Sequence, residues 1–143
     1  MIVDTAADVP FGAFEKTAPF TDCYFVDLKA ADVADYRDVI GGNFDRVCAN
    51  IRRLVAAGLP MHIRIPLIPD FNTSRDYVKQ MTVVLKDLGV TAVDLLPFHR
   101  MGSSKYTALG WPYAYAKTEP FTPEQVEEIA DGYRRYFQVT IER

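Results

Sequence analysis

Short apolar segments alternate with segments whose apolar residues recur at helical spacing, and this alternation constrains the fold more than any other feature. The apolar segments have the length of strands and are residues 2–5, 23–28, 61–68, 92–96 and 138–142. The candidate helices between them are residues 10–18, 31–39, 43–57, 74–88 and 122–136. Strands that alternate with helices in this way favour parallel pairing through right-handed crossovers.

Two of the helices have clear start and stop signals. Asn43 is a typical N-cap, and Gly58 follows the last apolar position of the same helix. Thr122, Pro123 and Gln125 combine a cap residue, a first-turn proline and the partner of a capping box. Residues 97–121 are predicted to form a long irregular segment.

The fold class expected from this order is α/β, with about half of an eight-unit parallel barrel in a single domain over residues 1–143. The competing architecture is an open doubly wound sheet. Its dinucleotide-binding version is disfavoured, because no glycine-rich phosphate loop follows the first strand.

Composition excludes several classes of function. The formal net charge is -3, which gives no electrostatic argument for nucleic acid or an anionic membrane as a partner. Apolar runs are too short to cross a bilayer, and the start of the sequence resembles a strand rather than a signal peptide. The two cysteines, Cys23 and Cys48, do not form a metal motif, and we interpret them as structural thiols in a reducing cytoplasm.

Polar residues occur at or beyond the carboxyl ends of the predicted strands, the edge that forms the active-site face of parallel barrels. These residues are Asp4 and Thr5 on the first strand, Asp27 and Lys29 on the second, Arg64 on the third and His99 after the fourth. Several have a structural alternative: a loop cap for Asp4, a simple ion pair for Asp27 and Lys29, or a partnered structural residue for His99. Arg64 lies inside an apolar strand, where a partly buried guanidinium needs an anionic or carbonyl partner, which a neighbouring loop could supply. Their occurrence at one end of one sheet favours a ligand site.

The types of these side chains suggest the kind of ligand. Lys29 and Arg64 suit a carboxylate, whereas Asp27 suits an ammonium group or ribose hydroxyls, and His99 can hydrogen-bond to or stack on a flat ring. An amino acid joined to a nucleoside would satisfy all four residues. S-adenosylmethionine is such a molecule.

Several ordered motifs resemble the radical-SAM activating enzymes of glycyl-radical enzymes, the pyruvate formate-lyase activating enzyme family. The matching segments are Val3-Asp4-Thr5-Ala6, Asp27-Leu28-Lys29, residues 64–69 (RIPLIP), residues 95–102 (LLPFHRMG), Lys105-Tyr106 and Leu109-Gly110. The resemblance covers nearly the whole chain and implies the C-terminal part of an incomplete parallel (β/α) barrel of about six units.

The resemblance also implies roles for individual residues. Asp27, Lys29, Arg64 and His99 would contact S-adenosylmethionine, and Asp4, Thr5 and Asp27 would lie near a monovalent cation. The family cleaves S-adenosylmethionine reductively to a 5′-deoxyadenosyl radical, which takes a hydrogen atom from a glycine of the partner, a glycyl-radical enzyme such as pyruvate formate-lyase. Residues 101–121 would lie near the side where the partner docks.

The sequence departs from the family in its cysteines. The family's Cys-x3-Cys-x2-Cys loop and Gly-Gly-Glu-Pro strand end are absent, and three thiolates are needed to hold the family's 4Fe-4S cluster. We therefore expect no cluster and no catalytic residue in this chain, with weak or lost S-adenosylmethionine binding.

Three hypotheses follow. The first is the C-terminal part of an activating enzyme, inactive alone because it lacks the N-terminal cluster-binding half. The second is a non-catalytic module that docks on a glycyl-radical enzyme or a separate N-terminal half, or self-associates through an exposed barrel edge. The third is an unrelated half-barrel hydrolase or isomerase using His99 and Lys29, which no nucleophile–base signature supports.

Overall fold

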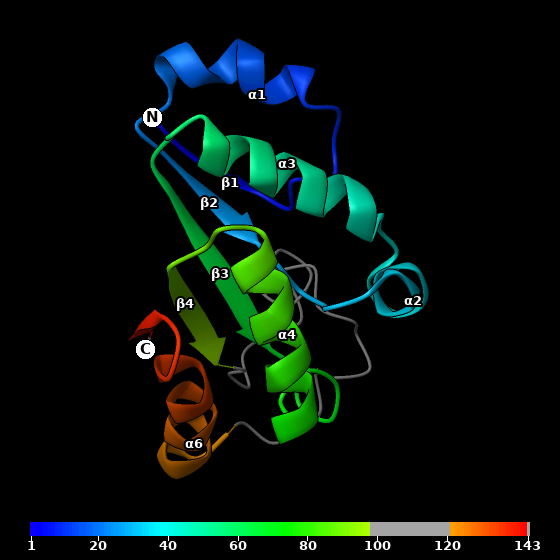
Figure 1. Ribbon diagram of the computed structural model, residues 1–143, viewed down its shortest axis with the longest axis vertical. Coiled ribbons are helices and arrows are strands. Elements are labelled where there is room, and N and C mark those ends of the chain that lie inside the picture. Colours follow the sequence, from blue (N-terminus) through cyan, green and yellow to red (C-terminus); the bar gives the residue numbers. More distant parts are fainter. Residues whose placement is uncertain (98–120, 143) are drawn as a thin grey trace, which may run out of the picture.

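In the computed structural model, which describes residues 1–97 and 121–142, a five-stranded sheet is covered by helices on one face (Figure 1). The strands are β1 (Ile2–Thr5), β2 (Cys23–Asp27), β3 (Met61–Leu67), β4 (Ala92–Pro97) and β5 (Gln138–Ile141). They lie side by side in chain order, and every neighbouring pair is parallel. The predicted α/β class and parallel pairing are therefore confirmed.

The helices occupy the connections between strands. They are α1 (Gly12–Thr17), α2 (Val33–Asp35), α3 (Phe44–Ala56), α4 (Arg75–Asp87) and α6 (Pro123–Arg134), with short turns η1 (Ala18–Phe20) and η2 (Tyr36–Ile40). In Figure 1, α3 and α4 lie in front of the strands, on the same side of the sheet. The predicted irregular segment falls almost wholly on residues 98–120, which lie outside the described part of the chain.

One predicted helix differs from the structure. Residues 31–39 were expected to form a single helix, but the three-residue α2 runs into the π-helical turn η2. The turn closes when the backbone N–H groups of Gly41 and Gly42 donate to the carbonyl of Tyr36, at 2.7 and 2.9 Å. Gly41 adopts φ +84°, a conformation that glycine reaches without a Cβ clash.

The predicted helix starts are confirmed. The Asn43 side chain accepts a hydrogen bond from the backbone N–H of Arg46 at 3.0 Å. Thr122 Oγ1 accepts from the N–H of Gln125 at 3.2 Å, and Gln125 Oε1 accepts from the N–H of Thr122 at 2.8 Å. Both halves of the capping box are thus present, and α6 begins where the sequence predicts.

The hydrophobic core lies between the sheet and its helices. Alternate residues of the central strands are buried against the helical layer, among them Val26, Ile63, Ile65, Val93 and Leu95. They pack with buried helix residues that include Ile51 and Leu54 of α3, Met81 and Leu85 of α4 and Tyr133 of α6. The core thus fixes one face of every strand, and strand alternation directs the intervening residues to the other face.

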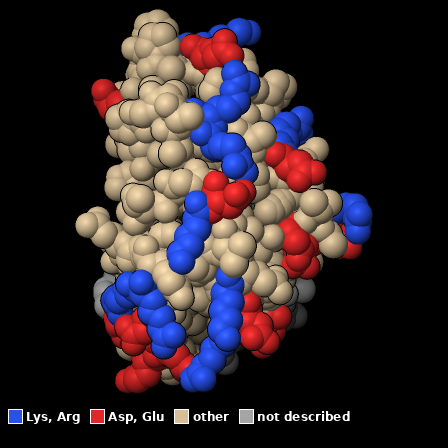
Figure 2. All heavy atoms as spheres, in the orientation of Figure 1, with Lys and Arg blue, Asp and Glu red and all other residues tan. Residues whose placement is uncertain are grey.

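That other face, here called the open face, bears most of the polar side chains of the sheet. It carries Asp4, Phe25, Asp27, His62, Arg64, Asp94, Thr140 and Glu142, which alternate with the core positions. Figure 2 shows the helix-covered side, where acidic and basic side chains are interspersed. Of the helices within residues 1–97 and 121–142, none is long and apolar enough to cross a membrane.

Candidate functional site

Arg64 occupies the centre of the open face. It lies in β3, the middle strand, and its register partners on the neighbouring strands are Asp27 of β2 and Asp94 of β4. Its side chain is only 16% exposed. A guanidinium this deeply buried needs anionic or carbonyl partners, as the sequence predicts.

The guanidinium finds those partners on strands at opposite edges of the sheet. Nη1 donates to Oδ1 of Asp4 at 3.1 Å, and Nη2 donates to Oε2 of Glu142, which follows β5, at 3.4 Å. The guanidinium carbon also lies 5.5 Å from the centre of the Phe25 ring. Nε is buried and has no hydrogen-bond partner among residues 1–97 and 121–142, so one donor of Arg64 remains available.

Asp27 ends β2 beside Arg64. Burial raises the pKa of its carboxyl, while Lys29 and Arg64 act in the opposite direction and Asp4 and Glu142 add a smaller increase. These five groups therefore share one electrostatic environment on the open face. Burial has the largest effect on the pKa of Asp27. The two cations therefore offset only part of the cost of burying this carboxylate.

Lys29 lies two residues beyond Asp27, where the chain has left the sheet. The residue is only 8% exposed. Its backbone N–H donates to the hydroxyl of Tyr36 at 2.9 Å, and its carbonyl accepts from the side chain of Asn72 at 3.1 Å. The positive charge of its ammonium group acts on the nearby carboxyl of Asp27 and lowers the pKa of that group.

The residues expected near a monovalent cation do not all face the same way. Asp4 is on the open face, where it bonds to Arg64, whereas its neighbour Thr5 alternates to the helix-covered side. Thr5 Oγ1 accepts from the backbone N–H of Ala7 at 2.9 Å. Among the described residues no group of three His, Cys, Asp or Glu could hold a metal ion. The cation site involving Asp4, Thr5 and Asp27 stays a prediction.

The structure thus brings together three of the four residues expected to contact S-adenosylmethionine: Asp27, Lys29 and Arg64. The fourth, His99, lies outside the described residues. Their assignment to this ligand stays a prediction.

Two charged residues of the open face were missed in the sequence. Asp94 lies within β4 and contacts His62 Nδ1 at 3.2 Å, and Glu142 reaches Arg64 from beyond β5. A charge inside an apolar strand, the signal that identified Arg64, also applies to Asp94. Glu142 sits in a short segment near other charges and gives no comparable signal.

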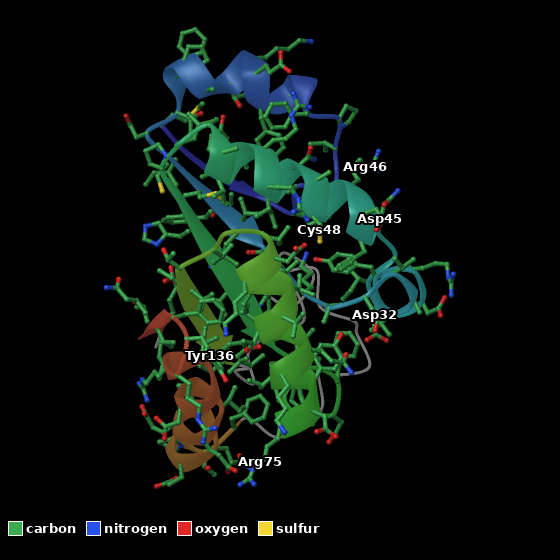
Figure 3. All side chains as sticks on the ribbon, in the orientation of Figure 1. Asp32, Asp45, Arg46, Cys48, Arg75 and Tyr136 are labelled. Atoms are coloured by element: carbon green, nitrogen blue, oxygen red, sulfur yellow. The ribbon has the colours of Figure 1, made fainter. Side chains whose placement is uncertain are left out.

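The two cysteines lie apart on different elements. Cys23 begins β2, and Cys48 lies on α3, labelled in Figure 3, where it packs against the core. Burial, with a smaller effect of Asp45, raises the pKa of Cys48 to about 12, and burial also raises the pKa of Cys23. The two thiols thus lie on separate elements, and burial favours the protonated form of each.

The chain is similar in sequence to several known activating enzymes. It is 40% identical to the pyruvate formate-lyase 2-activating enzyme of Escherichia coli, over 97% of this chain and 48% of the relative. It is 34% identical to the benzylsuccinate synthase activating enzyme of Thauera aromatica, over 89% and 40%. The trans-4-hydroxy-L-proline dehydratase activating enzyme of Clostridioides difficile is 31% identical, over 89% and 43%. The chain spans about half the length of these curated relatives or less.

Solved structures agree on the fold. A domain of a pyruvate-formate lyase-activating enzyme from Bacteroides vulgatus superposes with a TM-score of 0.77 at 22% identity, covering 99% of this chain and 80% of that one. Streptococcus suis SuiB, in a structure bound to S-adenosylmethionine, gives 0.70 at 8% identity, covering 99% and 31%. A radical SAM methyltransferase from Sphaerobacter thermophilus gives 0.70 at 18% identity, covering 99% and 39%. No protein-family model matches the chain.

Proposed function

Because the chain belongs to the radical-SAM activating enzymes of glycyl-radical enzymes, we propose that it forms the S-adenosylmethionine-binding part of such an enzyme. The observation that carries this proposal is the pair of buried cations on or beside the open face. Arg64 has a buried Nε without a partner among the described residues, and Lys29 is buried as a residue and acts electrostatically on Asp27. Both have donors to offer to an anionic ligand.

These residues fit the chemistry of S-adenosylmethionine. Its carboxylate matches Lys29 and Arg64, and its ammonium or ribose hydroxyls match Asp27, whose carboxylate is only partly compensated by the two cations. When bound, S-adenosylmethionine supplies the radical with which the family oxidises a glycine of the partner enzyme. The chain's own residues orient the amino-acid end of the ligand on the open face of the sheet. The opposite face of the sheet is covered by the hydrophobic core.

The residues do not fit the 4Fe-4S cluster. The 143 residues contain two cysteines, on different elements and with raised pKa values, whereas the family uses three thiolates. The thiolates would have to come from outside residues 1–143, so this chain alone is inactive.

Anaerobic reconstitution of the full chain with iron and sulfide tests this inactivity. We expect no cluster absorption and no 5′-deoxyadenosine after reduction in the presence of S-adenosylmethionine. A stoichiometric cluster that yields 5′-deoxyadenosine would show that the chain is catalytically complete.

An NMR titration of the full chain with S-adenosylmethionine tests the binding itself. Without the cluster as an anchor we expect a Kd of about 1 mM, or about -4 kcal/mol. Arg64→Met and Lys29→Met should each weaken binding about tenfold, the effect of one lost charge-assisted contact. Arg37→Met is the matched control, because Arg37 is exposed and pairs with its neighbour Asp38. Micromolar binding that survives Arg64→Met contradicts the proposal.

The activating-enzyme family makes a glycyl-radical enzyme the proposed partner, and the 40% identity to a pyruvate formate-lyase 2-activating enzyme favours a pyruvate formate-lyase-like one. Immobilised pyruvate formate-lyase and a glycyl-radical dehydratase, each titrated with the full chain, test this choice. Stronger binding to the lyase supports it, and equal or absent binding to both contradicts it.

A second candidate is a module that assembles with another polypeptide, and it is favoured by the edge strand β1. This strand pairs only with β2 in the described sheet, and its residue Ile2 is 61% exposed on the open face. An unpaired edge with an exposed apolar side chain invites a further strand. Light scattering after size exclusion tests this role. A chain that is monomeric at all concentrations and does not bind the partner enzyme excludes it.

A further inference from the structure

The buried side chain of Asn72 joins the ends of two strands of the proposed site. Asn72 is 0% exposed, and its amide nitrogen donates to the carbonyl of Lys29 at 3.1 Å and to the carbonyl of Pro66 at 2.8 Å. Its amide oxygen accepts from the backbone N–H of Ile68 at 2.8 Å. Both N–H donors and the carbonyl of the side chain are therefore used, all on backbone groups.

This pattern requires an asparagine. An aspartate of the same shape would place carboxylate oxygens against two carbonyls, because it has no N–H to donate. A leucine of similar volume would leave three buried backbone groups unpaired, at a cost for each. Asn72 thus specifies how the loop after β2 sits against the end of β3.

The backbone of Lys29 depends on side chains because β2 has ended at Asp27. Its N–H donates to the hydroxyl of Tyr36 at 2.9 Å and its carbonyl accepts from Asn72, so no strand ladder holds it. Two residues on, the N–H of Ala31 donates to the hydroxyl of Tyr77 at 3.0 Å, and that hydroxyl donates to Asp35 at 2.7 Å. The backbone that carries the Lys29 side chain is therefore held by Tyr36 and Asn72, and two residues further on by Tyr77.

We propose that Asn72 is a positioning residue that, with the Tyr36 hydroxyl, holds Lys29 in place to bind a ligand carboxylate beside Arg64. The role rests on the proposed function, since it assigns Asn72 to the same site without contact to the ligand. A cation on a flexible four-carbon stem binds a carboxylate well only when its stem is fixed in advance.

The chain provides a matched control in Asn50. Asn50 is also buried, and its amide nitrogen donates to the carbonyls of Ala7 and Val9, both at 2.7 Å. Asn50→Ala therefore removes buried amide–backbone hydrogen bonds of the same kind, but these hold the loop after β1 and none of them goes to Lys29. A difference in ligand binding between Asn72→Ala and Asn50→Ala therefore reflects which loop has lost its hydrogen bonds, and not a general loss of stability.

The experiment compares S-adenosylmethionine with its decarboxylated analogue by NMR titration of the full chain. We expect the intact chain to prefer the carboxylate form about tenfold. Asn72→Ala should abolish most of this preference with little effect on the analogue, whereas Asn50→Ala should keep it. Tyr36→Phe, which removes one hydroxyl and retains the ring, should reduce the preference in the same way and serves if Asn72→Ala does not fold.

A second readout separates this inference from the proposed function. Amide hydrogen exchange at Lys29 should accelerate at least tenfold in Asn72→Ala relative to Asn50→Ala, at matched global stability. An intact chain that binds no S-adenosylmethionine overturns the proposed function, while the exchange rates still test the positioning. A carboxylate preference or a Lys29 exchange rate that Asn72→Ala leaves unchanged, or that Asn50→Ala alters equally, overturns the role of Asn72.

Discussion

Arg64 Nη1 donates to Asp4 Oδ1 at 3.1 Å, and this contact joins β3 to β1 across the intervening strand β2. Since Arg64 also reaches Glu142 beyond β5, one side chain connects the middle of the sheet to both of its edges. The open face is therefore organised around a single cation, with Phe25 of β2 beneath the span. Any ligand that recruits Arg64 competes with two carboxylates already in place.

The two ends of the Arg64–Asp4 pair should contribute unequally to stability. Asp4 is 71% exposed, so Asp4→Asn should cost at most about 1 kcal/mol. Arg64→Met should cost more, about 2–3 kcal/mol, because Asp4, Asp27 and Glu142 then repel one another near a buried site. Urea denaturation of the two variants and of the double variant measures both costs and their coupling. Equal costs for the two single variants would show that Arg64 has no central role.

The charge of Asp27 should make stability depend on pH. Burial raises its folded-state pKa above the ordinary value of 3.8, so the folded protein binds this proton more readily than the unfolded chain does. The contribution of Asp27 to the free energy of unfolding therefore falls as the pH rises from 3.8 through the higher folded-state pKa. The stability of Asp27→Asn relative to the unmodified chain should grow over that interval, as followed by urea denaturation at several pH values.

Asp38 provides a control of opposite sign for this measurement. Its hydrogen bond with Arg37 lowers the pKa of Asp38, so its stabilising contribution is present above pH 3.8 and is lost as the pH falls. Asp38→Asn should therefore lose stability relative to the unmodified chain as the pH rises. The same pH trend in both variants would contradict the assignment of burial as the main influence on Asp27.

Local signals in the sequence were sufficient for most of the fold. Thr122 with Gln125, and Asn43, located helix starts because capping depends on residues within one turn. The structure of residues 31–39 was harder to predict, because a π-turn and an α-turn differ only in which carbonyl accepts the closing hydrogen bonds. Here the acceptor is the carbonyl of Tyr36, and its use depends on the position of Gly41 and Gly42. This leaves no periodic pattern in the sequence.

The site was predictable only in part, for a physical reason. Parallel strands place their carboxyl ends at one edge, so Asp27 and Arg64 could be brought together from strand order alone. The partners of Arg64 depend on how the edges of the sheet approach its centre, which strand order does not specify. Asn72 follows a turn like many surface asparagines, and its burial under the loop after β2 becomes visible only in three dimensions.

The capping box of α6 should have a measurable effect on stability. Thr122→Ala removes the acceptor for the Gln125 N–H and should cost about 1 kcal/mol. Thr122→Ser retains the hydroxyl and should lower the free energy of unfolding by only about 0.3 kcal/mol. Thermal unfolding of the two variants, followed by circular dichroism, makes the comparison. A Ser variant as unstable as the Ala variant would locate the effect in the lost methyl group instead.

Cys48 should be almost unreactive in the folded protein. Its pKa of about 12 leaves about one thiolate in ten thousand at pH 8, and its side chain packs against the core beneath α3. Alkylation by iodoacetamide at pH 8, followed by mass spectrometry of the peptide, should therefore be at least a hundredfold slower in buffer than in urea.

Asp45→Asn distinguishes the two influences on that thiol. Burial is the larger cause of the raised pKa and the charge of Asp45 the smaller, so removing the charge should accelerate native alkylation only several-fold. Urea should abolish the difference between the variant and the unmodified chain, because both influences require the folded helix. Native alkylation as fast as that in urea would mean that α3 opens readily, and that the core beneath Cys48 does not close as the structure indicates.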